Sequence, residues 1–160
     1  MEPHEGISTE FWRFVRLAES HQLEYLVIGG MAMNFHGLLR NTIDTDIWLK
    51  PTRENLDRLC EIVLEMGYDA DEFRFLREIQ EIQNLVFMIE GPIDFLTTLH
   101  HRIHFDDCTV RKTVVQLEGI PIPVLGLEDL RESKILARRD QDLRDVLIID
   151  KKLKNNNRNH

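Results

Sequence analysis

The stretch that most constrains the fold runs from Tyr25 to Lys50, with the sequence Y-L-V-I-G-G-M-A-M-N-F-H-G-L-L-R-N-T-I-D-T-D-I-W-L-K. It predicts a short apolar strand, two glycines, a turn of helix and a second apolar strand that opens with Asp44 and Asp46. Side chains two apart on a strand share a face, so both carboxylates lie on one side, about 7 Å apart along the backbone. Like charges this close repel each other unless a cation lies between them. The stretch therefore indicates a cation site on one face of a sheet.

The rest of the chain predicts a mixed sheet flanked by helices. Helical periodicity recurs in five segments: 8–20, 53–66, 71–83, 127–139 and 141–153. Apolar, β-prone runs with turns between them predict two hairpins: 85–89 with 93–97, and 109–117 with 120–125. We therefore expect one α/β or α+β domain over residues 1–153, closed by the helical pair of 127–153, and a disordered tail over 154–160.

Composition and charge narrow the classes of function. The chain has 160 residues, 42% of them hydrophobic and 30% charged, as in ordinary soluble domains. Its net charge of −8 argues against broad contact with nucleic-acid phosphates. Residues 131–160 are locally basic, which suits either a phosphate-bearing partner or a solvated helix face. We expect no membrane partner, and the two cysteines, in no metal-type spacing, favour a reduced, cytoplasmic setting.

A third carboxylate, Asp94, lies in the run G-P-I-D-F-L-T of a later predicted strand. It is either an exposed acid on an edge strand or the third member of a set with Asp44 and Asp46. Mg²⁺ prefers such oxygen ligands, and two Mg²⁺ ions can clamp the attacking and leaving oxygens of a nucleotidyl transfer. Gly29 and Gly30 fit a phosphate approach at the start of a helix, although a plain strand-to-helix turn also explains them.

This combination of G-G, about a dozen residues, D-x-D on a strand and a later strand aspartate resembles the polymerase-β-like nucleotidyltransferase superfamily. The fuller motif is similar to the small prokaryotic branch, which contains minimal nucleotidyltransferases and toxins of type IV toxin–antitoxin systems. Residues 124–146, V-L-G-L-E-D-L-R-E-S-K-I-L-A-R-R-D-Q-D-L-R-D-V, are similar to the closing segment of that branch. Where the branch usually has Lys-Asp, this chain has Gln141-Asp142. The resemblance covers residues 25–146.

The resemblance implies an enzyme that uses Mg²⁺ and a nucleoside triphosphate such as ATP. Asp44, Asp46 and Asp94 would be the catalytic metal ligands, and Asp94 would also be the base for an acceptor hydroxyl. An in-line attack of that hydroxyl on the α-phosphate would release pyrophosphate. The resemblance also implies that Asp142 or Asp145 positions Lys134. The implied nucleotide-binding residues are Gly29, Gly30, Arg40, Thr42, Lys134, Asp142 and Asp145.

Several alternatives stay open from the sequence. Lys134 also fits a surface lysine, and Asp142 and Asp145 also fit local pairing with nearby arginines. The acceptor would be tRNA, a protein or a small hydroxyl compound, and a cognate antitoxin protein would be a partner of a toxin-like member. A catalytically inert, antitoxin-type binding module is the alternative function.

Three further features of the sequence each have two interpretations. Trp48 shares the carboxylate face and either walls a cleft or covers the sheet. His36 fits a nucleotide contact or a bond to the backbone. The run His100-His101-x-x-His104 resembles a zinc site, but adjacent histidines rarely both bind one ion.

Overall fold

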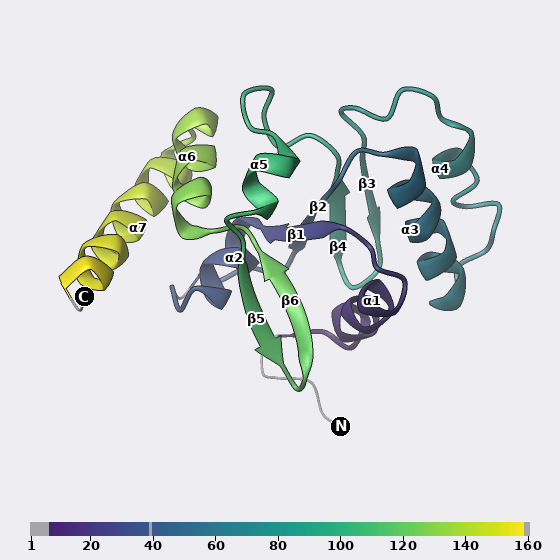
Figure 1. Cartoon of the computed structure of the whole chain (residues 1–160), viewed down its shortest axis with the longest axis horizontal. Coiled ribbons are helices and arrows are strands. Elements are labelled where there is room, and N and C mark those ends of the chain that lie inside the picture. Colours follow the sequence, from purple (N-terminus) through teal and green to yellow (C-terminus); the bar gives the residue numbers. More distant parts are fainter. Residues whose placement is uncertain (1–6, 39, 159–160) are drawn as a thin grey trace.

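The structure, a computed structural model, describes residues 7–38 and 40–158, which form a six-stranded mixed sheet with helices around it (Figure 1). The strands lie in the order β3-β4-β2-β1-β6-β5. Their bounds are β1 Tyr25–Ile28, β2 Thr45–Leu49, β3 Val86–Ile89, β4 Ile93–Leu96, β5 Thr113–Leu117 and β6 Ile120–Val124. The central β2–β4 and β1–β6 pairs are parallel, whereas the outer pairs β3–β4 and β5–β6 are antiparallel hairpins. The predicted mixed sheet and both predicted hairpins are confirmed.

Seven helices within the described residues complete the fold. They are α1 Thr9–Ser20, α2 Gly29–Phe35, α3 Arg53–Glu65, α4 Phe75–Glu78, α5 Phe105–Thr109, α6 Leu127–Ala137 and α7 Asp140–Arg158. Two of these helices have side-chain caps, because the side chains of Ser8 and Thr52 accept the N–H groups of Phe11 and Asn55. None of these helices is both long and apolar enough to cross a membrane.

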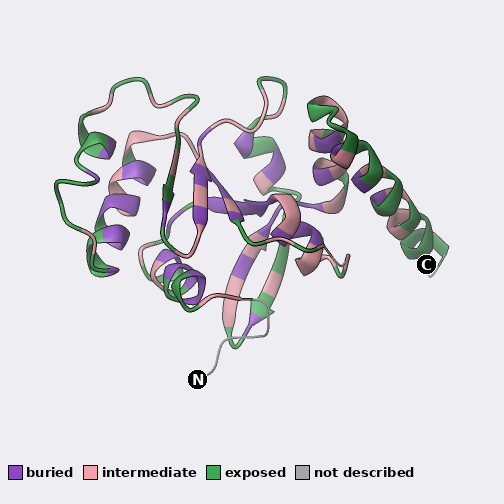
Figure 2. Ribbon diagram, turned by 180° about the vertical axis from the view of Figure 1, so that it is seen from behind, coloured by how far each residue is buried: buried purple, intermediate pink, exposed green. Residues whose placement is uncertain are grey.

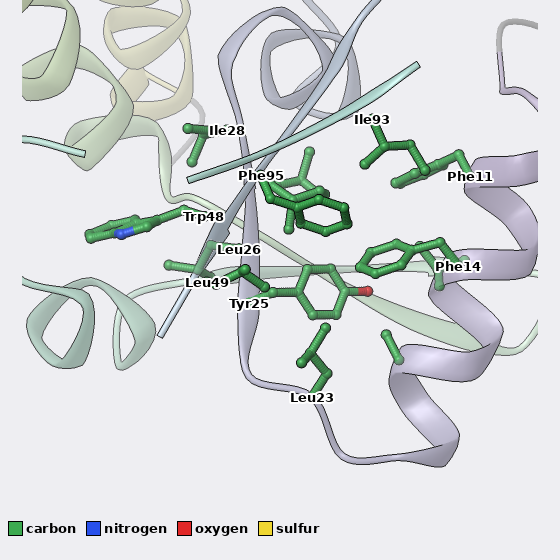
Figure 3. Packing of buried hydrophobic residues seen from close by; sticks show 14 of the residues in the cluster. Phe11, Phe14, Leu23, Tyr25, Leu26, Ile28, Trp48, Leu49, Ile93 and Phe95 are labelled. Carbon is green, nitrogen blue, oxygen red and sulfur yellow. The ribbon is translucent and has the colours of Figure 1, made fainter. Parts of the chain in front are cut away.

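One face of the sheet is an apolar core covered by α1, α3 and α4 (Figures 1 and 3). The ring of Phe14 on α1 lies edge-on to Tyr25 and to Phe95, with centroids 5.4 Å apart in each case. Phe87 stacks on Phe95 with ring centroids 5.2 Å apart, and the rings of Phe87 and Phe75 of α4 lie edge to face. Burial follows this packing, since Figure 2 shows buried residues on the strands and on the inner sides of the helices.

The opposite face of the sheet carries the acids. Cross-strand partners share a face, and the register pairs Ile28 with Asp46, Asp46 with Asp94 and Asp94 with Met88. Two residues further along β2, Trp48 is only 2% exposed and lies under Phe105 of α5, with ring centroids 5.2 Å apart. The end of this face that lies under α5 is therefore apolar and covered, and the other end is acidic.

Two predicted elements differ from the structure. The helix expected over 71–83 is only the short α4, because the guanidinium of Arg53 donates to the carbonyl oxygens of Leu76 and Arg77, which a longer helix would use internally. The strand expected over 109–117 begins only at Thr113, because Phe105 and Cys108 bury one side of a helical turn, α5, beforehand.

The end of the chain also differs from its prediction. Helix α7 continues to Arg158, so the disordered tail expected over 154–160 is wrong for residues 154–158, and 159–160 lie outside the described residues. The side chain of Leu153 still packs against the core, and the helix continues about one turn beyond this contact. The predicted closing helical pair is present as α6 and α7, which lie side by side in Figure 1.

Candidate functional site

The centre of the candidate site is the pair Asp46 and Asp94. Strands β2 and β4 are parallel, and their register places Asp94 directly beside Asp46, one strand spacing of about 4.8 Å away. Both side chains are half-buried. Asp44 is exposed in the segment before β2, where its carbonyl oxygen accepts the Thr42 hydroxyl at 3.0 Å. Asp46 and Asp94 thus share a face of the sheet, whereas Asp44, which was predicted to share the face of Asp46, lies just outside β2.

Burial and neighbouring acids raise the pKa of Asp46 and of Asp94. Burial is the first cause that raises the pKa of Asp46, followed by the charges of Asp94 and Asp44, while Lys134 and Arg139 partly lower it. Burial and the charge of Asp44 raise the pKa of Asp94. A bound cation would relieve this repulsion, because it favours the ionised form of each carboxylate.

Carboxylates are the type of ligand that Mg²⁺ prefers, but the three aspartates do not form a group around one point. Among residues 7–38 and 40–158, no group of three or more His, Cys, Asp or Glu side chains is arranged to hold a metal ion. Asp46 and Asp94 supply adjacent carboxylate oxygens, the ligands that Mg²⁺ takes together with substrate phosphates. The pair therefore fits a metal that also binds a substrate, with Asp44 as the exposed acid nearest to it.

Gly29 lies against the carboxylate of Asp46. Its φ is +65°, and a Cβ built there would come within 2.5 Å of Asp46 Oδ2. Gly30 packs against Thr42, whose Cβ would lie 3.0 Å from an added methyl group. Both predicted glycines thus let the start of α2 approach β2 and the segment before it, and any side chain at residue 29 would displace Asp46.

A buried ion-pair network forms the wall opposite the acids. Lys134 Nζ of α6 lies 2.8 Å from Asp145 Oδ2 and 3.6 Å from Asp142 Oδ1 of α7. Arg40 Nη1 lies 2.5 Å from Asp145 Oδ1, and Arg139 Nε lies 2.7 Å from Asp142 Oδ2. Lys134, Asp142 and Asp145 are all buried. Asp142 and Asp145 therefore pair with arginines and also hold Lys134, so pairing with arginine and positioning of the lysine are both compatible with the structure.

The pKa of Asp142 reflects the same network. Burial alone would raise the pKa of this carboxyl group, but hydrogen bonds and the positive charge of Arg139, together with Lys134, bring it below its usual value. The carboxylate thus stays ionised beside the two cations, and it keeps them at the edge of the cleft.

A cleft of about 340 Å³ separates this wall from the strands. It is lined by Ile28, Gly29 and Asp46 on the sheet side and by Lys134, Arg139 and Asp142 on the helix side. Of the other predicted residues, Asp94 adjoins the cleft through its strand pairing with Asp46. Gly30, Arg40, Thr42 and Asp145 support the cleft from behind, through the contacts described above.

Among the lining residues that were not predicted as site residues, Arg139 and His100 carry basic side chains. Arg139 precedes Asp142 by three helical positions, and this spacing was the available signal for their pairing. His100 also lines the cleft, although the sequence indicated only a doubtful zinc site for it.

Two residues with open interpretations are placed by their hydrogen bonds. The Nε2 of His36 donates to the carbonyl oxygen of Leu125 at 2.8 Å, as expected for a histidine bonded to the backbone. Trp48 covers the sheet, because it is buried and its Nε1–H donates to the carbonyl oxygen of Thr97.

Comparison with known proteins adds the fold assignment. No protein-family model and no curated sequence matches the chain. A proposed nucleotidyltransferase from Thermotoga maritima superposes with a TM-score of 0.55 at 16% identity, over 95% of this chain and 98% of that one. The chain has the nucleotidyltransferase fold. An antigenic nucleotidyltransferase-like protein from Paracoccidioides brasiliensis is similar as well, with a TM-score of 0.56, 15% identity, and coverage of 89% of this chain and 77% of that chain. The fold predicted from the sequence motifs is therefore confirmed.

Proposed function

We propose that this protein is a Mg²⁺-dependent nucleotidyltransferase, which transfers a nucleoside monophosphate from a nucleoside triphosphate such as ATP to an acceptor hydroxyl. The observation that carries the proposal is the direct strand pairing of Asp46 with Asp94 on the sheet face that meets Lys134 and Arg139 across the cleft. Paired acids opposite paired cations suit a reaction in which a metal–triphosphate complex lies between them.

In this proposal Asp46 and Asp94 bind Mg²⁺, with Asp44 as the third ligand. The bound metal would supply charge neutralisation at the phosphates. Asp94, whose pKa is raised, accepts the proton of the acceptor hydroxyl as its oxygen bonds to the α-phosphorus and pyrophosphate leaves.

The remaining residues of the proposed site bind or position the nucleotide. Lys134 and Arg139 neutralise the triphosphate and the leaving pyrophosphate from the opposite wall. Asp142 and Asp145 position these cations, and Arg40 holds Asp145. Gly29 and Gly30, with Thr42 behind them, leave room for the phosphates beside Asp46.

The alternative is a catalytically inert binding module of the antitoxin type. It is favoured by the absence, in the described residues, of a converged set of three metal ligands, and by Gln141, whose amide donates to Asp145 Oδ1 at 3.0 Å. A toxin–antitoxin role and a cognate antitoxin are predictions that rest on the sequence resemblance alone, and a cytoplasmic location is a prediction from the two cysteines.

A labelling experiment tests the proposed function. Incubating the purified protein with each α-³²P-labelled nucleoside triphosphate, Mg²⁺ and cell extract should label one class of acceptor, and EDTA should abolish the labelling. Asp46→Asn should lower the rate by about 100-fold or more, because it removes a charge from the metal side of the site. The control is Asp57→Asn, a half-exposed aspartate on α3, which lies over the other face of the sheet. Absence of both labelling and metal-dependent nucleotide binding would exclude the enzyme and favour the inert module.

A further inference from the structure

A second cavity of about 490 Å³ adjoins the carboxylate cleft. Trp48 lies at its base, two residues after Asp46 on β2, so the cavity lies over the next row of side chains on the same sheet face. Two residues of strand span about 7 Å. His100 lines both the cavity and the cleft, which makes the two spaces neighbours that share one wall.

The shared wall is a neutral, fixed imidazole. The backbone N–H of Arg102 donates to His100 Nδ1 at 3.1 Å, so Nδ1 carries no proton and Nε2 carries it. The N–H of Ile103 also donates to the carbonyl oxygen of His100 at 3.0 Å, which closes a tight turn. Burial, and then the neighbouring His101 and Arg102, lower the pKa of His100, in agreement with a neutral ring. His100 therefore offers a hydrogen-bond donor without a charge.

Around His100 the cavity presents solvent-exposed side-chain groups that form no hydrogen bond with another described residue. Within residues 7–38 and 40–158, neither the imidazoles of His101 and His104 nor the amide of Asn84 makes a hydrogen bond. The ring of His101 is held in place by stacking on His100, with centroids 4.3 Å apart. Hydrogen-bonding groups that converge on a cavity of several hundred Å³ are typical of a small-molecule site.

The lining of the cavity is also balanced in charge. Its lysine, Lys50, lies 3.3 Å from Asp106 and 3.7 Å from Glu24, so its charge is already paired. A nucleic acid binds when several protein cations neutralise its phosphates and release the counterions condensed there, whereas the described lining of this cavity offers a single, already paired lysine. A neutral ligand with several hydroxyl groups matches the imidazole and amide groups that remain.

We infer that this second cavity binds the acceptor of the transfer reaction and that the acceptor is a small, neutral, polyhydroxylated molecule. The inference rests on the proposed function for its reaction but not for its ligand class. A hydroxyl group that extends past His100 reaches the row of Asp46 and Asp94. Its oxygen then forms the new bond to the α-phosphorus, its proton passes to Asp94, and the bond to pyrophosphate breaks.

The test uses four polyols as small acceptors, namely myo-inositol, D-glucose, sucrose and glycerol. Bulk tRNA and casein are the two macromolecular acceptors. Each is incubated with α-³²P-labelled nucleoside triphosphates and Mg²⁺, and binding of the four polyols is measured separately by ligand-detected NMR without nucleotide. The variant His101→Phe/His104→Phe keeps the rings but removes their hydrogen bonds. His21→Phe is the matched control, because His21 bonds Glu65 and lines neither space.

We expect label on a polyol, and the double variant should raise the KM for that polyol about 10-fold or more, since two hydrogen bonds are lost. The KM for the nucleotide should change less than about twofold, and His21→Phe should match the wild type.

The other outcomes separate the inference from the proposed function. Label only on tRNA or casein, or on no acceptor despite nucleotide binding, overturns the inference and leaves the nucleotide site standing. A raised KM for the nucleotide instead would mean that the cavity holds the donor nucleoside. Failure of all four polyols to bind in the NMR experiment also overturns the inference. The protein could also bind a polyol but no nucleotide, with the polyol binding lost in the double variant. That result would support the ligand class and exclude the proposed function.

Discussion

At the scale of single residues, the site depends on how closely Gly29 approaches Asp46. Gly29→Ala would introduce a methyl group within 2.5 Å of Asp46 Oδ2, at a φ of +65° that alanine adopts only with strain. We expect this variant to lose about 1–3 kcal/mol of stability through backbone strain. Transfer should fall at least about 10-fold, because Asp46 must move from its position beside Asp94. Urea denaturation and the labelling rate measure the two effects.

The matched control for this variant is Gly119→Ala. Gly119 has a φ of +84°, yet nothing lies within 4 Å of an added Cβ there. This control therefore has the backbone strain without the contact, and its labelling rate should equal that of the wild type. Equal rates for both variants would show that the position of Asp46 does not matter for the reaction.

The sequence alone predicts which acids and glycines are candidate site residues, because strand parity and glycine spacing are local properties. Placing Asp46 and Asp94 on one face needs only the strand pattern, but placing them side by side needs the β2–β4 pairing, which joins residues about 50 positions apart. The exposure of Asp44 was not predicted, because the start of β2 at Thr45 is set by pairing with β4, including the Thr45 N–H bond to the Pro92 carbonyl oxygen.

At the scale of elements, α6 and α7 are joined by the buried Lys134. Lys134→Met would leave the carboxylates of Asp142 and Asp145 buried without this cation, although Arg139 and Arg40 still contact them. We expect a loss of about 3 kcal/mol in the free energy of unfolding, at the lower end for breaking a buried pair. Urea denaturation measures this loss.

A second ion pair between the same helices provides the control for Lys134. Arg131 and Asp150 lie 2.5 Å apart but are partly exposed, so Arg131→Met should change the stability far less. If both variants unfold at the same urea concentration, the buried network does not stabilise the wall of the cleft.

Long amphipathic helices were predictable, whereas the short helices α4 and α5 were not. Helix α3 has its cap and its apolar stripe in its own sequence. Helices α4 and α5 have four and five residues, and such lengths are not stable alone. Their formation depends on distant partners, Arg53 for α4 and Trp48 for α5, which the local pattern does not reveal.

At the scale of the whole molecule, the sheet separates two buried thiols. Cys60 lies on α3 over the core face, and Cys108 lies on α5 over the face with the acids. Burial is the main cause that raises the pKa of both, for Cys108 to about 11. Because the thiolate is the reactive form, neither cysteine should react with a thiol reagent in the folded protein near pH 8.

If both faces of the sheet unfold as one cooperative unit, the two thiols should become reactive at the same urea concentration. Cys60→Ser and Cys108→Ser each leave one thiol, so labelling with 5,5′-dithiobis(2-nitrobenzoic acid) across a urea series gives a midpoint for each face. We expect the two midpoints to coincide with each other and with the loss of helical circular dichroism, after correction for the stability of each variant. An earlier midpoint for Cys108 would show that α5 opens separately from the core, and the second cavity and the carboxylate cleft would then share a face that is less stable than the core.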